Sequence, residues 1–161
     1  MSDGTLRVRL ATESDLDTLV ALEVEPDTAR YLGFIGREFH RRAFADDDQE
    51  QIVAEIDGRV VGFVVLAGLR TGGGRIELRR IVLSNSYRGA GHGRALFRAA
   101  VARAYRDHGA KELWLDVKPD NLRGQKLYES EGLVRTGTIP DPTDPDGELL
   151  VMTYLTPPAY P

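Results

Sequence analysis

The feature that most constrains the fold is a glycine-rich turn between an apolar strand and an amphipathic helix. The turn reads Arg88-Gly89-Ala90-Gly91-His92-Gly93, after a segment at 75–83 that has the alternation of a strand. Apolar side chains then recur at helical spacing over 94–108, and Gly109 ends the helix. Glycine lets the backbone approach a ligand closely, and the first turn of a helix carries unpaired N–H groups and the positive end of the dipole. The pattern therefore predicts an anion site, at which Arg88 and Arg94 could add charge-assisted hydrogen bonds.

Two common phosphate-binding motifs fail at a defining position of this turn. A P-loop would end in Gly-Lys-Ser/Thr, whereas Gly93 is followed by Arg94 and Ala95. A dinucleotide fingerprint counted from Gly89 would need its third glycine at position 94, which is arginine. What remains is R-x-x-G-x-G, formed by Arg88, Gly91 and Gly93. A plain tight turn is the structural alternative to an anion site.

The order of elements along the chain predicts a single α/β domain over 1–161 with a mixed sheet. A half-buried strand is expected at 6–10, a helix capped by Thr12 or Ser14 follows it, and short helices joined by a loop are expected within 26–48. Asp57-Gly58 between two apolar runs is typical of a hairpin with a type I′ turn. The remaining expected elements are a strand at 113–117, a helix from about 121 to 128, and strands at 133–138 and 148–155.

Composition excludes several classes of function. The formal net charge is −4, so the chain lacks the basic balance of a nucleic-acid binder. It contains no cysteine, which removes disulfides, thiol nucleophiles and cysteine-ligated metals. The start of the chain lacks the pattern of a signal peptide and no apolar run approaches about 20 residues, so we expect a cytoplasmic protein that does not span a membrane.

Several side chains outside the turn are candidates only for ordinary roles. His40, His92 and His108 are scattered without the spacing of metal ligands, so no metal site is expected. Trp114 alternates with apolar neighbours in its strand, which favours core packing or a partner on the face of the sheet. Asp116 could face an active site, but a charged strand residue near arginines is the simpler interpretation.

The turn and its surroundings resemble the GNAT superfamily of N-acetyltransferases, whose acetyl-CoA signature is [Q/R]-x-x-G-x-[G/A]. The resemblance includes the strand at 77–83, Leu115-Asp116-Val117, and the sequence from Asn121 to Leu133, which looks like the family's N-x-x-A-x-x-L-Y-x-x-x-G-F. Gly124 and Leu133 replace the usual alanine and phenylalanine of that motif. A glycine at 124 is expected to weaken the helix by up to about 1 kcal/mol relative to alanine. The strong match covers about 75–135.

The resemblance implies a fold and a donor site. It implies a single domain with a mixed, mostly antiparallel sheet of about six to seven strands, helices on both faces, and central strands that splay apart. The pantetheine arm of acetyl-CoA would pair with the backbone of Ile81, Val82 and Leu83, and Asn121 would bond it. The N–H groups of Arg88, Gly89, Ala90, Gly91, His92, Gly93 and Arg94 would hold the pyrophosphate.

The resemblance also implies an enzyme that transfers acetyl from acetyl-CoA to an amine. The amine attacks only when neutral, so a base is needed, and Glu77 is the candidate, directly or through water. Its alternative role is a surface residue paired with Arg75 or Arg79. Tyr128, which would also touch the cofactor, is the candidate acid for the departing thiolate, and its alternative role is edge packing.

Other functions and partners stay open at the level of sequence. A CoA-binding or sensing module of the same fold without turnover is the main alternative, and a nucleotide-binding regulatory domain is disfavoured by the failed fingerprints. The acceptor could be a small molecule or a protein amine, with no nucleic acid or membrane as partner, and a homodimer is possible. The chain offers no cysteine for an acyl-cysteine intermediate. Direct attack in a ternary complex is therefore the simplest mechanism.

Overall fold

A seven-stranded sheet in the order β1-β2-β3-β4-β5-β7-β6 organises the protein. The computed structural model describes residues 4–26, 28 and 36–159. The strands are β1 (Arg7–Leu10), β2 (Gln49–Ile56), β3 (Arg59–Ala67), β4 (Arg75–Leu83), β5 (Glu112–Val117), β6 (Val134–Pro140) and β7 (Glu148–Thr153). Neighbouring strands are antiparallel except β4 and β5, which are parallel. The prediction of a mixed, mostly antiparallel sheet is confirmed.

The hairpin of β2 and β3 forms as its turn residues predict. Asp57 and Gly58 have φ values of 54° and 77°, which is the left-handed conformation that a type I′ turn needs at both positions. The strand predicted at 6–10 also forms as β1, but all four of its residues are exposed, so the expectation of a half-buried strand was wrong. β1 pairs only with β2 and lies at the edge of the sheet, where its apolar residues meet water instead of a core.

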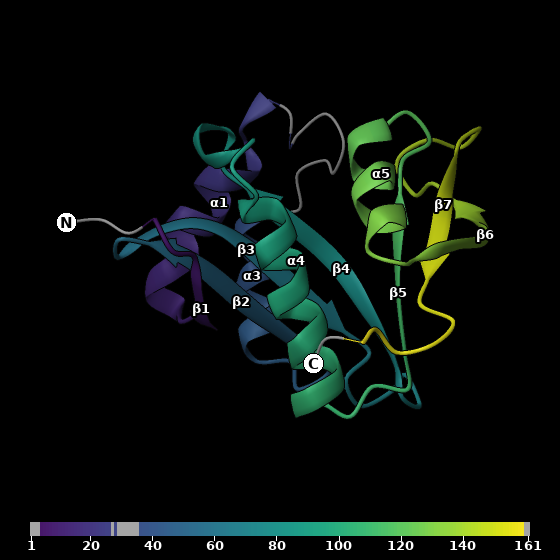
Figure 1. Cartoon of the computed structure of the whole chain (residues 1–161). Helices are drawn as coiled ribbons and strands as arrows, with labels where there is room; N and C mark the ends of the chain where they lie inside the picture. The colour runs from purple at the N-terminus through teal and green to yellow at the C-terminus, as the bar shows by residue number, and fades with distance from the viewer. Residues whose placement is uncertain (1–3, 27, 29–35, 160–161) are drawn as a thin grey trace.

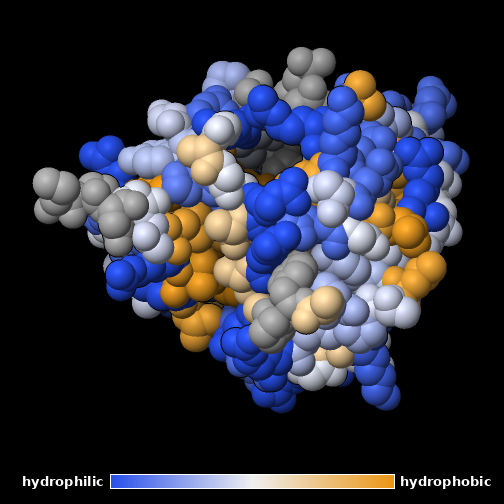
Figure 2. Space-filling view, viewed as in Figure 1, coloured by the Kyte–Doolittle hydropathy of each residue, from blue (hydrophilic) through white to orange (hydrophobic). Residues whose placement is uncertain are grey.

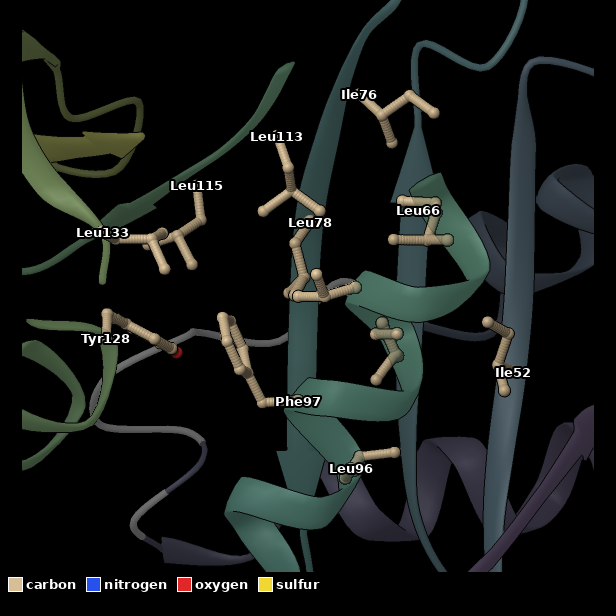
Figure 3. Packing of buried hydrophobic residues seen from close by; sticks show 14 of the residues in the cluster. Ile52, Leu66, Ile76, Leu78, Leu96, Phe97, Leu113, Leu115, Tyr128 and Leu133 are labelled. Atoms are coloured by element: carbon tan, nitrogen blue, oxygen red, sulfur yellow. The ribbon is translucent and has the colours of Figure 1, made fainter. Parts of the chain in front are cut away.

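Helices cover both faces of the sheet (Figure 1). On one face α1 (Leu16–Glu23) buries Leu19 and Leu22 against Val53, Phe63 and Val82, and α3 (Gly36–Phe44) packs beside α1. On the other face α4 (His92–Ala102) and α5 (Leu122–Ser130) contribute to the larger core cluster. Figure 3 shows Phe97 of α4 within this cluster, among the leucines of β4 and β5.

Two helical segments differ in detail from the predictions. The helix expected over 94–108 is α4 up to Ala102, and it continues as a π-helical turn over Arg103–Asp107. Within the predicted stretch 26–48, the structure confirms a helix as α3. Residues 27 and 29–35 of that stretch lie outside the described part of the chain.

The central strands β4 and β5 separate from each other along their length. They pair only where Arg75, Ile76 and Glu77 face Glu112, Leu113 and Trp114, although β4 continues to Leu83. The register of β4 against β3 also shifts between Val65 and Leu66, which places a bulge at Arg79. Figure 1 shows the two strands close together at one end and well apart at the other. The predicted splay is present, with its closed end at Glu77 and its open end beside the start of α4.

Candidate functional site

The glycine turn joins the open end of the splay to α4. Gly89 and Gly91 have φ values of 87° and 83°, a conformation that side chains with a Cβ rarely adopt, and Gly91 is the N-cap of α4. The first internal bond of the helix runs from the Ala95 N–H to the Gly91 carbonyl at 3.1 Å. The N–H groups of 92–94 therefore precede the helical ladder and are available to an anion.

A cavity of about 450 Å³ opens between this turn and α5. Ile81 and Leu83 form its wall on the β4 side, and Tyr128 lies at the end of its α5 wall. The lining residues are Ile81, Leu83, Arg88, Gly89, Gly93, Asn121, Arg123, Gly124, Leu127 and Tyr128. Figure 2 shows a hollow in this face with hydrophilic residues around its rim. The cavity is apolar inside and basic at its mouth, which suits a ligand with an aliphatic arm and an anionic end.

Tyr128 forms the inner wall of this cavity. Its side chain is 8% exposed, and its ring lies 5.6 Å from the ring of Phe97 on α4. Figure 3 shows the Tyr128 hydroxyl turned toward Phe97 across the space between α4 and α5. Burial raises the pKa of Tyr128 to about 12, and the charge of Asp116 contributes. The phenol therefore keeps its proton at neutral pH.

The α5 N-terminus is built around Asn121. The Asn121 side chain accepts the Gly124 N–H at 3.0 Å and caps the helix. A Cβ at position 124 would come within 2.8 Å of the Asn121 amide nitrogen. Gly124 thus makes room for the cap beside it, a role that the expectation of a weaker helix did not include.

The structure gathers most, but not all, of the sequence-predicted donor residues around the cavity. Seven of them line it: Ile81, Leu83, Arg88, Gly89, Gly93, Asn121 and Tyr128. The Val82 side chain lies in the core against α1. The Arg94 guanidinium is 2.7 Å from Glu131, which it shares with Arg98 at 2.9 Å. Only the main chain of Arg94 therefore remains as a candidate contact.

Glu77 faces the other side of the sheet, at the closed end of the splay. It is paired with Arg79 at 3.0 Å, as the alternative for this residue predicted, and it lines a small polar pocket with Trp114 and Arg75. Trp114 is only half-buried, and the Arg75 guanidinium lies 4.6 Å from its ring centre. The expectation of core packing for Trp114 was wrong, and the expectation of a partner on the sheet face was right.

Asp116 is a candidate functional residue to which the sequence analysis gave too little weight. Its strand buries Leu113, Leu115 and Val117 in the core, so Asp116 projects from the same face as Trp114 and Glu77. Burial raises the pKa of Asp116 to about 6, and the negative charges of Glu77 and Asp141 act in the same direction. Because Asp116 also raises the pKa of Tyr128, its charge reaches both Glu77 and Tyr128. The available signal was an acidic residue placed between the apolar residues Leu115 and Val117 of the strand.

A buried polar network lies on the same face of the sheet as Glu77 and Asp116. His40, fully buried on α3, contacts Glu23 with one ring nitrogen and Gln51 with the other, and Glu23 is 3.7 Å from Arg80. The Gln51 amide nitrogen donates to the His40 carbonyl at 3.2 Å. His108 likewise contacts Glu50. The sequence offered no sign of these contacts, because Glu23, Gln51 and Glu50 are distant in sequence from the histidines that they contact.

The described part of the chain has no helix long and apolar enough to cross a membrane. Within the same ranges, no group of three or more histidine, aspartate or glutamate side chains could hold a metal ion.

Comparisons with known proteins agree with this geometry. A sequence model described as the acetyltransferase (GNAT) family matches residues 11–133. The chain is 26% identical to the aminoglycoside N(6′)-acetyltransferase type 1 of Klebsiella pneumoniae, over 94% of this chain and 83% of that protein.

Two solved structures share the fold. The spermidine N-acetyltransferase of Vibrio cholerae in complex with CoA and spermine has a TM-score of 0.79 at 19% identity, covering 92% of this chain and 94% of its own. The aminoglycoside acetyltransferase AAC(6′)-Ib with coenzyme A has a TM-score of 0.77 at 24% identity, over 92% and 94% of the two chains. Since the family match spans most of the sequence, including the splayed strands, the glycine turn and α5, this chain belongs to the acetyltransferase (GNAT) family.

Proposed function

We propose that this N-acetyltransferase moves the acetyl group of acetyl-CoA directly onto a primary amine of a small cationic acceptor. One observation carries the proposal: the gap between β4 and β5 has a donor-shaped cavity on one face and a carboxylate pair on the other. Asp116 lies on the face opposite the cavity, and its charge acts on Tyr128 in the cavity wall and on Glu77 beside it. Two substrates bound from opposite faces would therefore meet inside the gap.

The donor would lie along the cavity with its acetyl end innermost. The pantetheine arm would follow Ile81, Val82 and Leu83 as an added strand, because β4 has no pairing with β5 beyond Glu77 among the described residues. The main-chain N–H groups at 89–94 would take the pyrophosphate, whereas the Arg88 N–H already donates to the Asn85 carbonyl at 3.3 Å. Asn121 would contribute through the amide nitrogen that its capping role leaves available.

The acceptor would enter from the face that carries Glu77 and Asp116. Two carboxylates at a partly buried site attract an ammonium ion, since an opposite charge offsets their repulsion. A base must then remove a proton before the nitrogen can attack, and a carboxylate works best when its pKa lies near the operating pH. Asp116, with a pKa of about 6, meets that condition, and Glu77 acts with it as base or as the anchor of the ammonium group.

The reaction joins these groups in one step without an enzyme-bound acyl intermediate. The amine nitrogen attacks the thioester carbonyl, the C–N bond forms, the C–S bond breaks, and the amine proton passes to a carboxylate or to water. The sulfur leaves as a thiolate next to Tyr128. A phenol with a pKa of about 12 is a weaker acid than a thiol, whose reference value is about 8.5. Tyr128 therefore stabilises the thiolate as a hydrogen-bond donor, and net protonation is completed from water.

Small cationic acceptors are supported by the relatives as well as by the charge of the site. The names of the relatives specify aminoglycosides and spermidine, which carry several amines. A direct test assays acetyl-CoA with four amines: kanamycin, spermidine, free lysine and a peptide with a free N-terminal amine. Turnover of the first two over the peptide supports the proposal. Binding of acetyl-CoA with no turnover of any amine would instead favour a CoA-sensing module.

Initial-rate kinetics test the direct mechanism. Intersecting double-reciprocal lines are expected for a ternary complex. Parallel lines would show that an acyl-enzyme forms on a residue other than cysteine, because the chain has none.

A further inference from the structure

The small polar pocket beside Glu77 lies at the closed end of the splay and has a volume of about 240 Å³. Its lining residues are Asp48, Ala67, Gly68, Thr71, Gly72, Arg75, Glu77, Arg79 and Trp114. Glu77 is also one of the two carboxylates at which the proposed reaction takes place. An acceptor whose reacting amine lies at Glu77 can therefore extend a second group into this pocket.

The pocket crosses four neighbouring strands of the sheet. Sheet pairing places Trp114 of β5 beside Glu77 of β4, and Glu77 beside Ala67 of β3. Ala67 in turn pairs with Gln49, and Asp48 comes directly before this first residue of β2. The main chain of Asp48 therefore lies about two strand spacings, or roughly 10 Å, from that of Glu77. Asp48 and Trp114 border the same space from opposite sides of Glu77.

Trp114 gives the pocket an aromatic wall on which a cation is already seated. The side chain is half-buried, and the Arg75 guanidinium lies 4.6 Å from its ring centre. Glu112 holds that guanidinium through a hydrogen bond of 2.6 Å. An indole ring attracts cations through its π electrons, and it also packs against methylene groups. Because the ring still borders the pocket, a second cation with an aliphatic chain can contact it there.

Asp48 provides a negative charge on the opposite wall. Its carboxylate accepts the Thr71 and Arg70 N–H groups and the Thr71 hydroxyl, each at 2.8 Å. These donors hold the pKa of Asp48 below its usual value, so the group is ionised at neutral pH. Within the ranges that the structure describes, Asp48 forms no ion pair, whereas Glu77 is paired with Arg79. The Asp48 charge is therefore available to a cationic ligand.

We infer that this pocket binds a second ammonium group of the acceptor, between the Trp114 ring and the Asp48 carboxylate, so that the enzyme prefers diamines and polyamines to monoamines. The inference rests on the proposed function and adds a specificity determinant to the acceptor side of the site. The reacting amine would lie at Glu77 and Asp116, and the carbon chain between the two nitrogens would lie in the pocket. A monoamine would leave the Asp48 charge without a partner.

The kinetic test compares 1,6-diaminohexane with hexylamine, which have the same chain length and differ by one ammonium group. With saturating acetyl-CoA and the full chain, Asp48→Asn should raise the KM for the diamine about 5-fold and leave the KM for hexylamine unchanged. Trp114→Leu should raise the KM for the diamine about 2- to 30-fold, and more than that for hexylamine. The kcat values should stay close to that of the wild type. Asp47→Asn removes the same charge from the adjacent position, which does not line the pocket, and should behave as the wild type does.

The fluorescence of Trp114 provides a measurement that does not depend on turnover. Trp114 is the single tryptophan of the chain, so its emission in the CoA complex reports on this pocket. Titration with 1,6-diaminohexane should change the emission at lower concentrations than titration with hexylamine. Asp48→Asn should remove that difference between the two amines.

Three results would overturn the inference while leaving the proposed function intact. They are equal KM values for the two amines in the wild type, equal effects of Asp47→Asn and Asp48→Asn, and a Trp114 emission that does not respond to a diamine that is acetylated. Failure to acetylate any amine would instead refute the proposed function. The fluorescence titration would then still decide whether the pocket prefers a ligand with two ammonium groups.

Discussion

The two faces of the β4–β5 gap differ in the chemical groups that form them. On the donor face, the proposed contacts are main-chain N–H groups of a glycine turn, a capped helix start and an apolar wall. On the acceptor face, the features are charged side chains held by other buried side chains, from Glu77 and Asp116 down to Glu23 and His40. Main-chain N–H groups can form a binding site with few specific side chains. A face of buried charged side chains also needs partners that stabilise those charges.

This difference decides how each face should respond to mutation. Single side chains on the donor face contribute increments of affinity. A single side chain in the network below the acceptor face keeps several charges compatible with burial, so its loss affects the fold. The following predictions test that contrast, from the largest expected effect to the smallest.

Glu23→Ala should destabilise the protein most. It leaves His40 and Arg80 without their buried carboxylate, and breaking such a contact costs about 3–5 kcal/mol. Urea unfolding should therefore show a much lower midpoint with an unchanged slope. Glu38→Ala is the matched control, because Glu38 pairs with Arg41 and Arg42 in water and should contribute less than about 1 kcal/mol. Equal effects of the two substitutions would refute the importance of the buried network.

Tyr128→Phe should lower kcat about 10- to 100-fold, because a hydrogen bond to a charged group contributes about 1.5–3 kcal/mol. The affinity for acetyl-CoA, measured by calorimetry, should stay close to that of the wild type, since the ring still fills the wall of the cavity. Tyr105→Phe removes a hydroxyl from the same core without touching the cavity and controls for packing. Full activity of Tyr128→Phe would exclude a role for the hydroxyl in the reaction.

The acid limb of the kcat/KM profile should lie near pH 6 and depend on Asp116. The ionised form is the base, so activity rises with pH through the Asp116 pKa of about 6. Asp116→Asn should abolish this limb. Glu77→Gln should lower kcat/KM and move the limb to lower pH, because it removes a charge that raises the pKa of Asp116. A limb unchanged in both variants would show that neither carboxylate titrates in the reaction.

The same carboxyl group links stability to pH in the opposite direction. The Asp116 pKa is about 6 in the folded protein and near 3.8 when the group is unperturbed, so between these values the folded state binds more protons than the unfolded state. The Asp116 contribution to stability therefore decreases as pH rises from about 4 to 6. Asp116→Asn should be more stable than the wild type at pH 7, and this gain should disappear near pH 4. Urea titrations at the two pH values measure it.

Gly124→Ala should have the smallest effect, with opposing contributions. Alanine favours the helix by up to about 1 kcal/mol, but its Cβ crowds the Asn121 amide that caps α5 and lines the cavity. Stability should change by less than about 1 kcal/mol, while the KM for acetyl-CoA rises a few-fold. Lys126→Ala, on the exposed side of the same helix, should leave that KM unchanged. An unaltered KM in Gly124→Ala would mean that the Asn121 amide does not contact the donor.

The contrast between the faces also explains what the sequence could predict. The glycine turn is local, because strand, glycines and helix follow one another along the chain, so the spacing of residues predicted this strand–turn–helix unit. The hairpin at Asp57-Gly58 was predictable for the same reason. The contacts of His40 join positions 23, 40 and 51, and no local pattern connects them. The Arg94 side chain was expected at the anion site, but only the packing of the helices decides that it meets Glu131 instead.

The interrupted pairing of β4 and β5 should make the stability of the protein depend on whether the donor is bound. Three residue pairs at the closed end are all that join these two strands in the sheet. A ligand that lies along Ile81 and Leu83 while touching α5 would brace the two halves together. Binding to the native state alone adds about 4 kcal/mol of stability at a ligand concentration 1,000 times Kd. Backbone amides of β4 near the open end should then exchange with solvent more slowly, so melting temperature and hydrogen exchange can rank donors before any acceptor is known.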